Sequence, residues 1–381
     1  MEPMTPSSSS RDRPGWSWTA LVAATLSAFV LAGCDDPAPV KIGFIGGLSG
    51  RSSDIGEASR NAVQLAVIEV NQHGGIDGHP IELLVRDDAN SPATAEAAVR
   101  DLYAAGVSAI IGPNVSVIAS GMLPAINELK IVTVSPTVSS LAFADLDDFL
   151  FRINWTTRDN ARIYARHYFD RGVRRVAAAI DIRNRVFSES WLNEFAAAFA
   201  GIGGTIVASD LFDATSERGY SATAERLLAG DAEAILLIAN SVDTAQMAHQ
   251  IRKLDDRILL IAAEWAASER LLVLGGSAIE GLELVQSYDR TDASDRFVRF
   301  QDAFRKQFQQ DPDYSSIAAY DAATVIFRAM HDRGDDQSLK DALIALPAVQ
   351  GLQQAIKFNR FGDAERQAFF VVVRDGGFRP L

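Results

Sequence analysis

Short apolar runs alternate with longer amphipathic stretches along most of this chain. Residues 40–45 are almost wholly apolar and end in a Gly-Gly pair, which is typical of a buried strand. The period then changes, because Val63, Ala66, Val67 and Val70 recur at the spacing of one helical face. The pattern therefore predicts a strand followed by an amphipathic helix, the opening of an α/β unit.

The same alternation continues through two successive blocks that meet near residues 151–157. Strands separated by helices of this length imply right-handed crossovers and mostly parallel sheets. We therefore expect an α/β protein with two doubly wound units. The predicted strands lie at 40–45, 81–85, 108–111, 131–135, 176–181, 205–211, 234–238 and 258–262, with helices between them, three further helices at 292–309, 316–332 and 337–346, and a β-rich tail at 355–358 and 369–374.

The first forty residues have a different character. A polar start with Arg11 and Arg13 precedes an apolar run at 16–30. At about 15 residues this run is shorter than the roughly 20 that span a bilayer comfortably. A basic start, an apolar middle and small residues at the exit are typical of a secretory signal peptide. The exit, Leu-Ala-Gly-Cys at 31–34, resembles the bacterial lipobox.

The lipobox resemblance implies that Cys34, the only cysteine, is lipidated and begins the mature chain. Residues 1–33 would be the lipoprotein signal peptide and residues 34–39 a tether. The acyl chains would anchor the protein at the periplasmic side of a bacterial envelope, and Asp35 favours the inner membrane if the enterobacterial sorting rule holds. The alternative is a chance cysteine after an apolar helix.

Composition narrows the possible functions. Hydrophobic residues make up 48% and charged residues 22% of the 381 residues, as in ordinary globular proteins. With 36 basic and 49 acidic residues, the net charge of −13 argues against binding to nucleic acid, which needs a basic surface. A single cysteine excludes an internal disulfide and a cysteine-rich metal site.

An ordered set of motifs resembles the type I periplasmic solute-binding proteins, and within them the branched-chain amino-acid receptors of ABC importers. The motifs are GLSG at 47–50, NQHGGIDG at 71–78, DD at 87–88, IGPNVS at 111–116, SPT at 135–137 and AYDAA at 319–323. The resemblance covers about residues 40–381. It implies a fold of two α/β lobes joined by a three-segment hinge, with a ligand held between them.

Motif order also implies where the lobes divide. The N-terminal lobe would comprise residues 40–155 plus 288–357, and the C-terminal lobe residues 156–287 plus 358–381. The crossing segments would lie near 153–157, 285–288 and 357–361. Such segments act as hinges that close two lobes around a ligand.

The resemblance implies polar ligand contacts from Ser116, Thr137 and Ser139, which follow two predicted strands. Ser116 lies at a helix start, where free backbone N–H groups hold a carboxylate, although such a serine often only caps the helix. Thr137 would offer a backbone carbonyl and Ser139 a hydroxyl, or both would belong to an ordinary turn. Glu264 would bind a ligand ammonium, unless it is a surface glutamate.

The remaining predicted pocket residues would shape its walls. Phe187, Ile55 and Ser241 map near positions where relatives keep aromatic side chains, so branched-chain specificity is in doubt. Trp265 either stacks on a ligand or packs beneath the loop. Arg183 and Arg185 either meet an anionic ligand or are solvated.

No constellation of residues favours an enzyme. The glycine-rich stretch at 46–50 lacks the Lys-Ser/Thr of a phosphate-binding loop, and no Gly-x-Ser-x-Gly elbow occurs. The five histidines show no metal-ligand spacing. We expect no catalytic residue, metal or cofactor, and instead a receptor that passes a small amino acid or carboxylate to ABC permease subunits. The alternatives are a ligand sensor for a membrane signalling system and a receptor for an amide, urea-like or aromatic-acid solute.

Overall fold

The computed structural model describes residues 1–4, 37–50, 53–213 and 219–381. The first 38 residues form a unit separate from residues 39–381. Cys34 and the apolar run at 16–30 lie outside the described residues, so the structure does not bear on the predicted signal peptide or lipidation. Within the described ranges, every helix is too short or too polar to cross a membrane.

The first lobe is built on a five-stranded parallel sheet, and its strands begin where the apolar runs begin. Ile42 and Phe44 of its central region face one side, while Ile45 and Ile110 face the other, so both faces are buried. In spatial order the strands are β2 (Ile81–Asp87), β1 (Val40–Gly46), β3 (Ala109–Ile111), β4 (Thr133–Ser135) and β5 (Leu150–Arg152).

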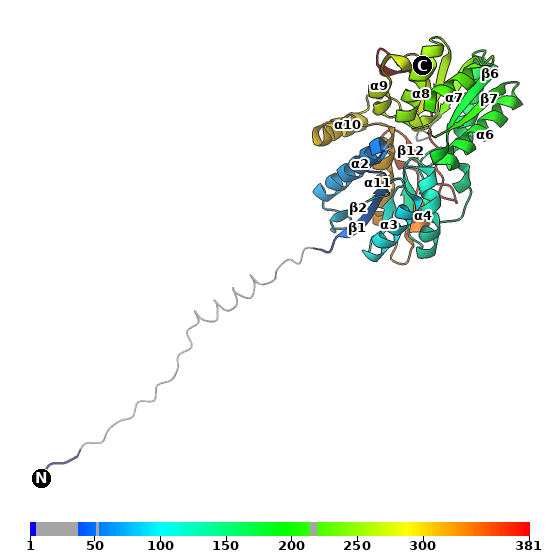
Figure 1. The fold of residues 1–381 in the computed structure, drawn as a ribbon. Coiled ribbons are helices and arrows are strands. Elements are labelled where there is room, and N and C mark those ends of the chain that lie inside the picture. Colours follow the sequence, from blue (N-terminus) through cyan, green and yellow to red (C-terminus); the bar gives the residue numbers. More distant parts are fainter. Residues whose placement is uncertain (5–36, 51–52, 214–218) are drawn as a thin grey trace. The chain divides into compact units, whose positions relative to one another are not determined.

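Helices cover both faces of this sheet. On one face α11 packs along α2, and these two helices lie side by side in Figure 1. On the other face α3 packs against α4, with Val99 and Met122 fully buried between them and the sheet. The helices of this lobe are α2 (Ser53–Gln72), α3 (Pro92–Ala104), α4 (Ser116–Leu129), α10 (Asp295–Phe308), α11 (Tyr314–Asp332) and α12 (Leu339–Ala345).

The second lobe holds a seven-stranded sheet. Five of its strands run parallel to one another, whereas the two C-terminal strands are antiparallel additions at one edge. In spatial order the strands are β14 (Gly377–Pro380), β13 (Phe369–Arg374), β10 (Glu283–Gln286), β9 (Leu259–Ala262), β8 (Ala234–Ile238), β6 (Arg175–Asp181) and β7 (Thr205–Phe212).

The helices of the second lobe lie between these strands in the chain. They are α5 (Thr157–Asp170), α6 (Arg185–Gly201), α7 (Gly219–Leu228), α8 (Ser241–Leu254) and α9 (Glu269–Gly275), with short 3-10 turns η2 (Ile182–Asn184), η3 (Glu264–Ala266) and η4 (Gly276–Ile279). A further turn η1 (Leu141–Phe143) lies between β4 and β5, and a small ladder of β11 (Val349–Gln350) and β12 (Ala355–Ile356) follows α12. The predicted fold class, two doubly wound α/β lobes, is confirmed.

Some elements were not predicted from the sequence. β5 lies just before the crossing segment expected near 153–157, and β10 overlaps the one expected near 285–288. Neither was predicted as a strand, because three or four residues are too few to show a hydrophobic period. β14 extends the predicted tail, since the turn at Asp375 and Gly376 folds the chain back on β13. The predicted strand at 355–358 is shorter, because β12 ends at Ile356.

Candidate functional site

A small cavity lies between the two lobes, where the loops after β3 and β4 face α6 and η3. Its volume is about 20 Å³, little more than a single water needs. Six of the eight predicted ligand-binding residues line it, and Ile55 and Ser241 do not. The lining residues are Asn114, Ser116, Thr137, Ser139, Asn154, Asn184, Phe187, Glu264, Trp265 and Tyr314.

Glu264 is the most distinctive group in this cavity. Only 8% of it is exposed, so the alternative of a surface glutamate is wrong. Asn160 Nδ2 and Ser139 Oγ donate to its Oε1 atom at 2.9 and 3.5 Å. Trp191 Nε1 donates to the other oxygen, Oε2, at 2.8 Å. Every side-chain donor that the described residues bring to this carboxylate is therefore neutral.

Burial raises the pKa of the Glu264 carboxyl, and the hydrogen bonds from Trp191, Asn160 and Ser139 offset only part of that rise. A buried carboxylate is costly without a positive partner, even when neutral groups donate to it. A ligand ammonium that entered the cavity would supply that partner. The arrangement suits charge-assisted binding of a small cation.

Ser116 lies on the opposite wall, in the first lobe. Gly112 makes the turn that leads from β3 toward α4: its φ is 121°, and a Cβ there would overlap the Ile45 carbonyl oxygen. Ser116 is the first residue of α4, and Val115 is the N-cap, so Ser116 is not the helix cap. The residue is only 2% exposed, and its hydroxyl has no hydrogen-bond partner among the described residues.

The loop after β4 brings Thr137 and Ser139 to the same cavity. The Thr137 hydroxyl donates to the Asn114 carbonyl at 2.7 Å, and Asn154 Nδ2 donates to the Thr137 carbonyl at 3.3 Å. The backbone carbonyl of Ser139 accepts from Thr157 N at 2.7 Å, which leaves its hydroxyl directed at Glu264. This loop is thus fixed by its own hydrogen bonds, as a preorganised binding loop should be.

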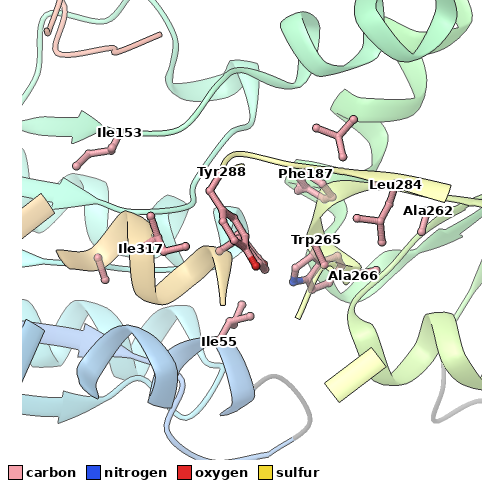
Figure 2. Packing of buried hydrophobic residues seen from close by; sticks show 14 of the residues in the cluster. Ile55, Ile153, Phe187, Ala262, Trp265, Ala266, Leu284, Tyr288 and Ile317 are labelled. Carbon is pink, nitrogen blue, oxygen red and sulfur yellow. The ribbon is translucent and has the colours of Figure 1, made fainter. Parts of the chain in front are cut away.

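Two aromatic side chains form the apolar wall. Phe187 and Trp265 meet edge to face, with ring centroids 5.6 Å apart and planes at 74°. The Trp265 Nε1 atom is buried and has no hydrogen-bond partner in the described part of the chain. In Figure 2 the Trp265 ring points toward Tyr288, whose hydroxyl is also buried and unpartnered. This geometry fits the alternative that Trp265 packs beneath the loop. Its contact with a ligand stays a prediction.

Ile55 and Ser241 do not line the cavity: Ile55 packs within the first lobe, and Ser241 contacts the first lobe from the second. Ile55 is 3% exposed within the core, and its carbonyl accepts from Ser315 Oγ at 3.2 Å. Ser241 Oγ donates to the Oδ2 atom of Asp54 at 2.8 Å. Both side chains are buried, with Ile55 3% and Ser241 2% exposed.

The two predicted arginines differ. Arg185 pairs with Glu189 on the exposed side of α6, at 2.8 Å, as expected for a solvated arginine that does not meet the ligand. Arg183 is half-buried and pairs with the buried carboxylates of Asp181, at 2.6 Å, and Asp243. Arg183 is thus held rigidly beside the interlobe region, outside the lining of the small cavity.

Several lining and supporting residues escaped sequence reasoning. Asn114 and Asn184 follow β3 and β6, and a polar residue just beyond a strand's carboxyl end is a usable signal in open α/β sheets. Asn160 and Trp191, which hold Glu264, come from the helices α5 and α6 and carry no local signal. Within the described ranges, no group of three His, Cys, Asp or Glu side chains is placed to hold a metal ion.

This site can therefore hold a small polar molecule through hydrogen bonds and one buried carboxylate. The sequence profile described as periplasmic binding protein matches residues 39–377. The chain belongs to the periplasmic binding protein family. The resemblance predicted from the ordered motifs is confirmed, and the family consists of solute-binding proteins.

Individual relatives share modest identity over nearly the whole length. The Leu/Ile/Val-binding protein BraC3 of Rhizobium johnstonii is 22% identical over 364 residues, covering 94% of this chain and 97% of that protein. The crystal structure of LivJ from Streptococcus pneumoniae, a branched-chain amino acid transporter substrate-binding protein in complex with isoleucine, matches with a TM-score of 0.83. It is 20% identical, over 89% of this chain and 97% of that one.

A third similar protein holds a different kind of ligand. A solute-binding protein of an ABC transporter from R. palustris, in complex with benzoate, matches with a TM-score of 0.79 and 16% identity. The match covers 90% of this chain and 96% of that one. At these identities the structures share the fold, and the fold alone does not fix the ligand.

Proposed function

We propose that this protein is the solute receptor of an ABC importer and that it captures a small amino acid or a related carboxylate between its lobes. One observation carries the proposal: a single cavity joins a buried carboxylate, Glu264, to an unpartnered hydroxyl at a helix start, Ser116. An α-amino acid presents an ammonium and a carboxylate, which match these two walls. The named relatives that bind leucine, isoleucine and valine support this assignment.

Capture would proceed by closure of the lobes. A cavity of about 20 Å³ leaves no room for an amino acid, so the lobes must part to admit a ligand. The proposed lobes are residues 40–155 plus 288–357 and residues 156–287 plus 358–381. Each sheet falls within one of these lobes, which supports the division. The crossing segments near 153–157, 285–288 and 357–361 would be the hinges.

The receptor would act at the membrane. Lipidation at Cys34 would hold it on the periplasmic side, with residues 34–39 as the tether and Asp35 favouring the inner membrane. The permease subunits of the importer would recognise the closed, liganded form. The signal-like composition of residues 1–33 supports export of the chain.

The test is a calorimetric titration of the full chain, unfolded and refolded to remove carried-over ligand. L-Leucine is compared with 4-methylpentanoate, which lacks the amine, and with 3-methylbutylamine, which lacks the carboxylate. We expect one-to-one binding of leucine and at least about tenfold weaker binding of both analogues, because each leaves one wall unpaired. Absence of leucine binding, together with absence of binding to other L-amino acids, would contradict the proposal.

Two serines of α4 provide a matched pair of variants. Ser116→Ala removes a hydroxyl from the cavity and should weaken leucine binding by about 1 kcal/mol, roughly fivefold. Ser120→Ala removes the exposed hydroxyl one turn later, which donates to the Ser116 carbonyl at 3.2 Å. It should leave affinity unchanged. Equal effects of the two variants would argue against a ligand contact at Ser116.

A second candidate is a receptor for an aromatic acid. Phe187, Trp265 and Tyr314 all line the cavity, and Glu264 already has neutral donors on both oxygens. The R. palustris protein that holds benzoate shows that this fold accommodates such a ligand. Benzoate in the same titration separates the two candidates: tighter binding of benzoate than of any amino acid would favour the second.

A further inference from the structure

A second, larger cavity adjoins the small one. Its volume is about 360 Å³, and it lies between the loops after β1 and β2, the start of α4, and the second lobe. Asn184 and Trp265 line both cavities, so they form the partition between them. In Figure 2 Trp265 lies on the side of the second lobe and faces Tyr288. A ligand whose polar head sits between Ser116 and Glu264 has room for its bulk only in this second cavity.

The accessible charge in the second cavity belongs to Arg183. Its Nε and Nη2 atoms donate to the two oxygens of Asp181, at 2.9 and 2.6 Å, and Nη2 also contacts Asp243. Both carboxylates are fully buried, whereas 28% of the Arg183 side chain is exposed. The Nη1 atom has no hydrogen-bond partner among the described residues. The guanidinium is therefore fixed in orientation and still has donors to offer.

Asn184 supplies a second donor to the same space. Its Oδ1 atom accepts from the Val117 amide of the other lobe at 3.0 Å, which fixes the orientation of the amide group. The Nδ2 atom is left with no partner in the described part of the chain, although only 3% of the residue is exposed. Because the residue is buried from bulk solvent, the space open to Nδ2 is that of the cavities it lines.

The backbone around this cavity also presents hydrogen-bond donors and partial positive charge. Three of its lining residues are N-caps of helices with fourteen or more residues: Val115 for α4, Asn184 for α6 and Asn240 for α8. Helix N-termini favour electron-rich groups. The Asn240 amide is already engaged, since its Oδ1 accepts from Asp243 N and its Nδ2 donates to the Asp243 carboxylate. The unfilled groups of the second-lobe wall are thus donors.

Resting on the proposed receptor function, we infer that the ligand is longer than a branched-chain amino acid, and that its distal arm ends in an acceptor oxygen bound by Arg183 and Asn184 in the second cavity. A side-chain carboxamide and a side-chain carboxylate share this chemistry. The two carboxylates behind Arg183 offset its charge, so the recognition depends on directed N–H groups as well as on attraction.

The test titrates the refolded full chain with L-glutamine, L-glutamate, L-leucine and L-homoleucine, an aliphatic isostere of the first two. We expect glutamine or glutamate to bind at least about tenfold more tightly than homoleucine, since an unpaired buried donor rejects the aliphatic arm. Whichever of the two binds more tightly identifies the neutral or the charged terminus. Leucine or homoleucine binding as tightly as both would overturn the inference while leaving the receptor function intact.

Variants then assign the contact. Arg183→Lys keeps a positive charge beside Asp181 and Asp243 but removes Nη1. It should reduce the preference for glutamine or glutamate over homoleucine at least about fivefold. Arg185→Met, on the exposed side of α6, is the matched control. It should change neither the affinity for glutamine or glutamate nor the affinity for homoleucine. A preference that survives Arg183→Lys in a folded protein would overturn the role of Arg183. No binding of any of the four amino acids would overturn this inference, and the proposed function falls with it only if the other L-amino acids also fail to bind.

Discussion

Ser241 donates a hydrogen bond of 2.8 Å to the Oδ2 atom of Asp54, and so joins the first turn of α8 to the first turn of α2. Ser268 donates to the same oxygen at 2.6 Å. Asp54 belongs to the first lobe, and both serines belong to the second. These contacts therefore form only when the two lobes approach each other, and they stabilise the closed arrangement.

Loss of both serine hydroxyls should favour the open form. Hydrogen bonds to charged groups contribute about 1.5–3 kcal/mol, of which water recovers part in the open state. We expect Ser241→Ala to weaken ligand binding about fivefold, and the double variant with Ser268→Ala to weaken it further, while the order of ligand preference stays the same. Calorimetry measures the affinity, and small-angle scattering measures the opening.

Ser277→Ala provides the control for that series, because Ser277 is exposed in the same lobe and makes no contact with Asp54. A double variant that binds as tightly as the unmodified protein would show that the Asp54 contacts contribute nothing to closure. A change in ligand order would instead place Ser241 in the binding site.

Asp313 should make stability depend on pH. It caps α11, with its Oδ1 atom accepting from the Ser315 and Ser316 amides at 3.0 Å, and burial raises its pKa from 3.8 to about 6. Between these values the folded state holds more protons than the unfolded state, so this group's contribution to stability falls as pH rises through the window and stays low above it. Asp313→Asn keeps the accepting oxygen and removes the charge.

We expect Asp313→Asn to lose less stability between pH 3.8 and about 6, and to be more stable at neutral pH by up to about 3 kcal/mol. Urea denaturation across that range measures the difference between variant and unmodified protein. Asp311→Asn, two residues earlier and exposed, should follow the unmodified curve. Parallel curves for Asp313→Asn would mean that the carboxyl titrates at its ordinary pKa in the folded protein.

The buried ion pair of Asp321 and Arg366 should matter for stability. Its atoms lie 2.6 Å apart, with the side chains 1% and 5% exposed, and Asp321 also accepts from Leu352 N at 2.8 Å. Removing one partner of a buried pair typically costs about 3–5 kcal/mol, because the other charge is left uncompensated. Arg366→Met should lose that amount in chemical denaturation. The aspartate of the AYDAA motif therefore has a structural role.

Two comparisons sharpen this prediction. Arg328→Met breaks an exposed pair with Asp332 on α11 and should cost less than about 1 kcal/mol. Replacing both partners, with Asp321→Leu and Arg366→Met, should recover most of the stability lost in the single variant. If the single variant is no less stable than the surface variant, the pair is not isolated from water in solution.

When the pH lies near the raised pKa of Glu264, ligand binding should release protons. Burial raises the pKa of Glu264 in the empty protein, whereas a ligand ammonium would stabilise its charged form. Affinity for an amine-bearing ligand should therefore fall as pH is lowered through that raised pKa, because the protonated acid cannot pair with the ammonium. Calorimetry in buffers of different ionisation enthalpy measures the proton. Proton uptake, or an affinity independent of pH, would contradict this role of Glu264.

The sequence predicted the fold well because the spacing of apolar residues follows which faces of the strands and helices are buried. Apolar runs such as residues 40–45 are buried on both faces of a sheet, and the face of Val63 and Ala66 packs in the core. β5 and β10 were missed because three or four residues carry no period. Their positions depend on pairing with β4 and β9, which are distant contacts that local patterns do not encode.

The candidate site was predictable only in part. Ser116, Ser139 and Glu264 follow strands whose carboxyl ends meet at the interlobe cavity, so motif order was enough to bring them together. The partners of Glu264 were not predictable, since Asn160 and Trp191 look like ordinary residues of amphipathic helices. Ser241 was assigned to the pocket by position, yet its hydroxyl faces Asp54, because a short side chain reaches only its immediate neighbour.

The most direct test of the receptor proposal is a thermodynamic cycle between Glu264 and the ligand amine. Leucine and 4-methylpentanoate are titrated into the unmodified protein and into Glu264→Gln, which keeps the size of the side chain and removes its charge. The amide turns one acceptor oxygen into a donor, and this loss affects both ligands equally. We predict a coupling free energy of about 2 kcal/mol or more, so that the substitution weakens leucine binding roughly thirtyfold more than binding of the analogue. Equal losses for the two ligands would contradict the account, because Glu264 would then not recognise an ammonium group.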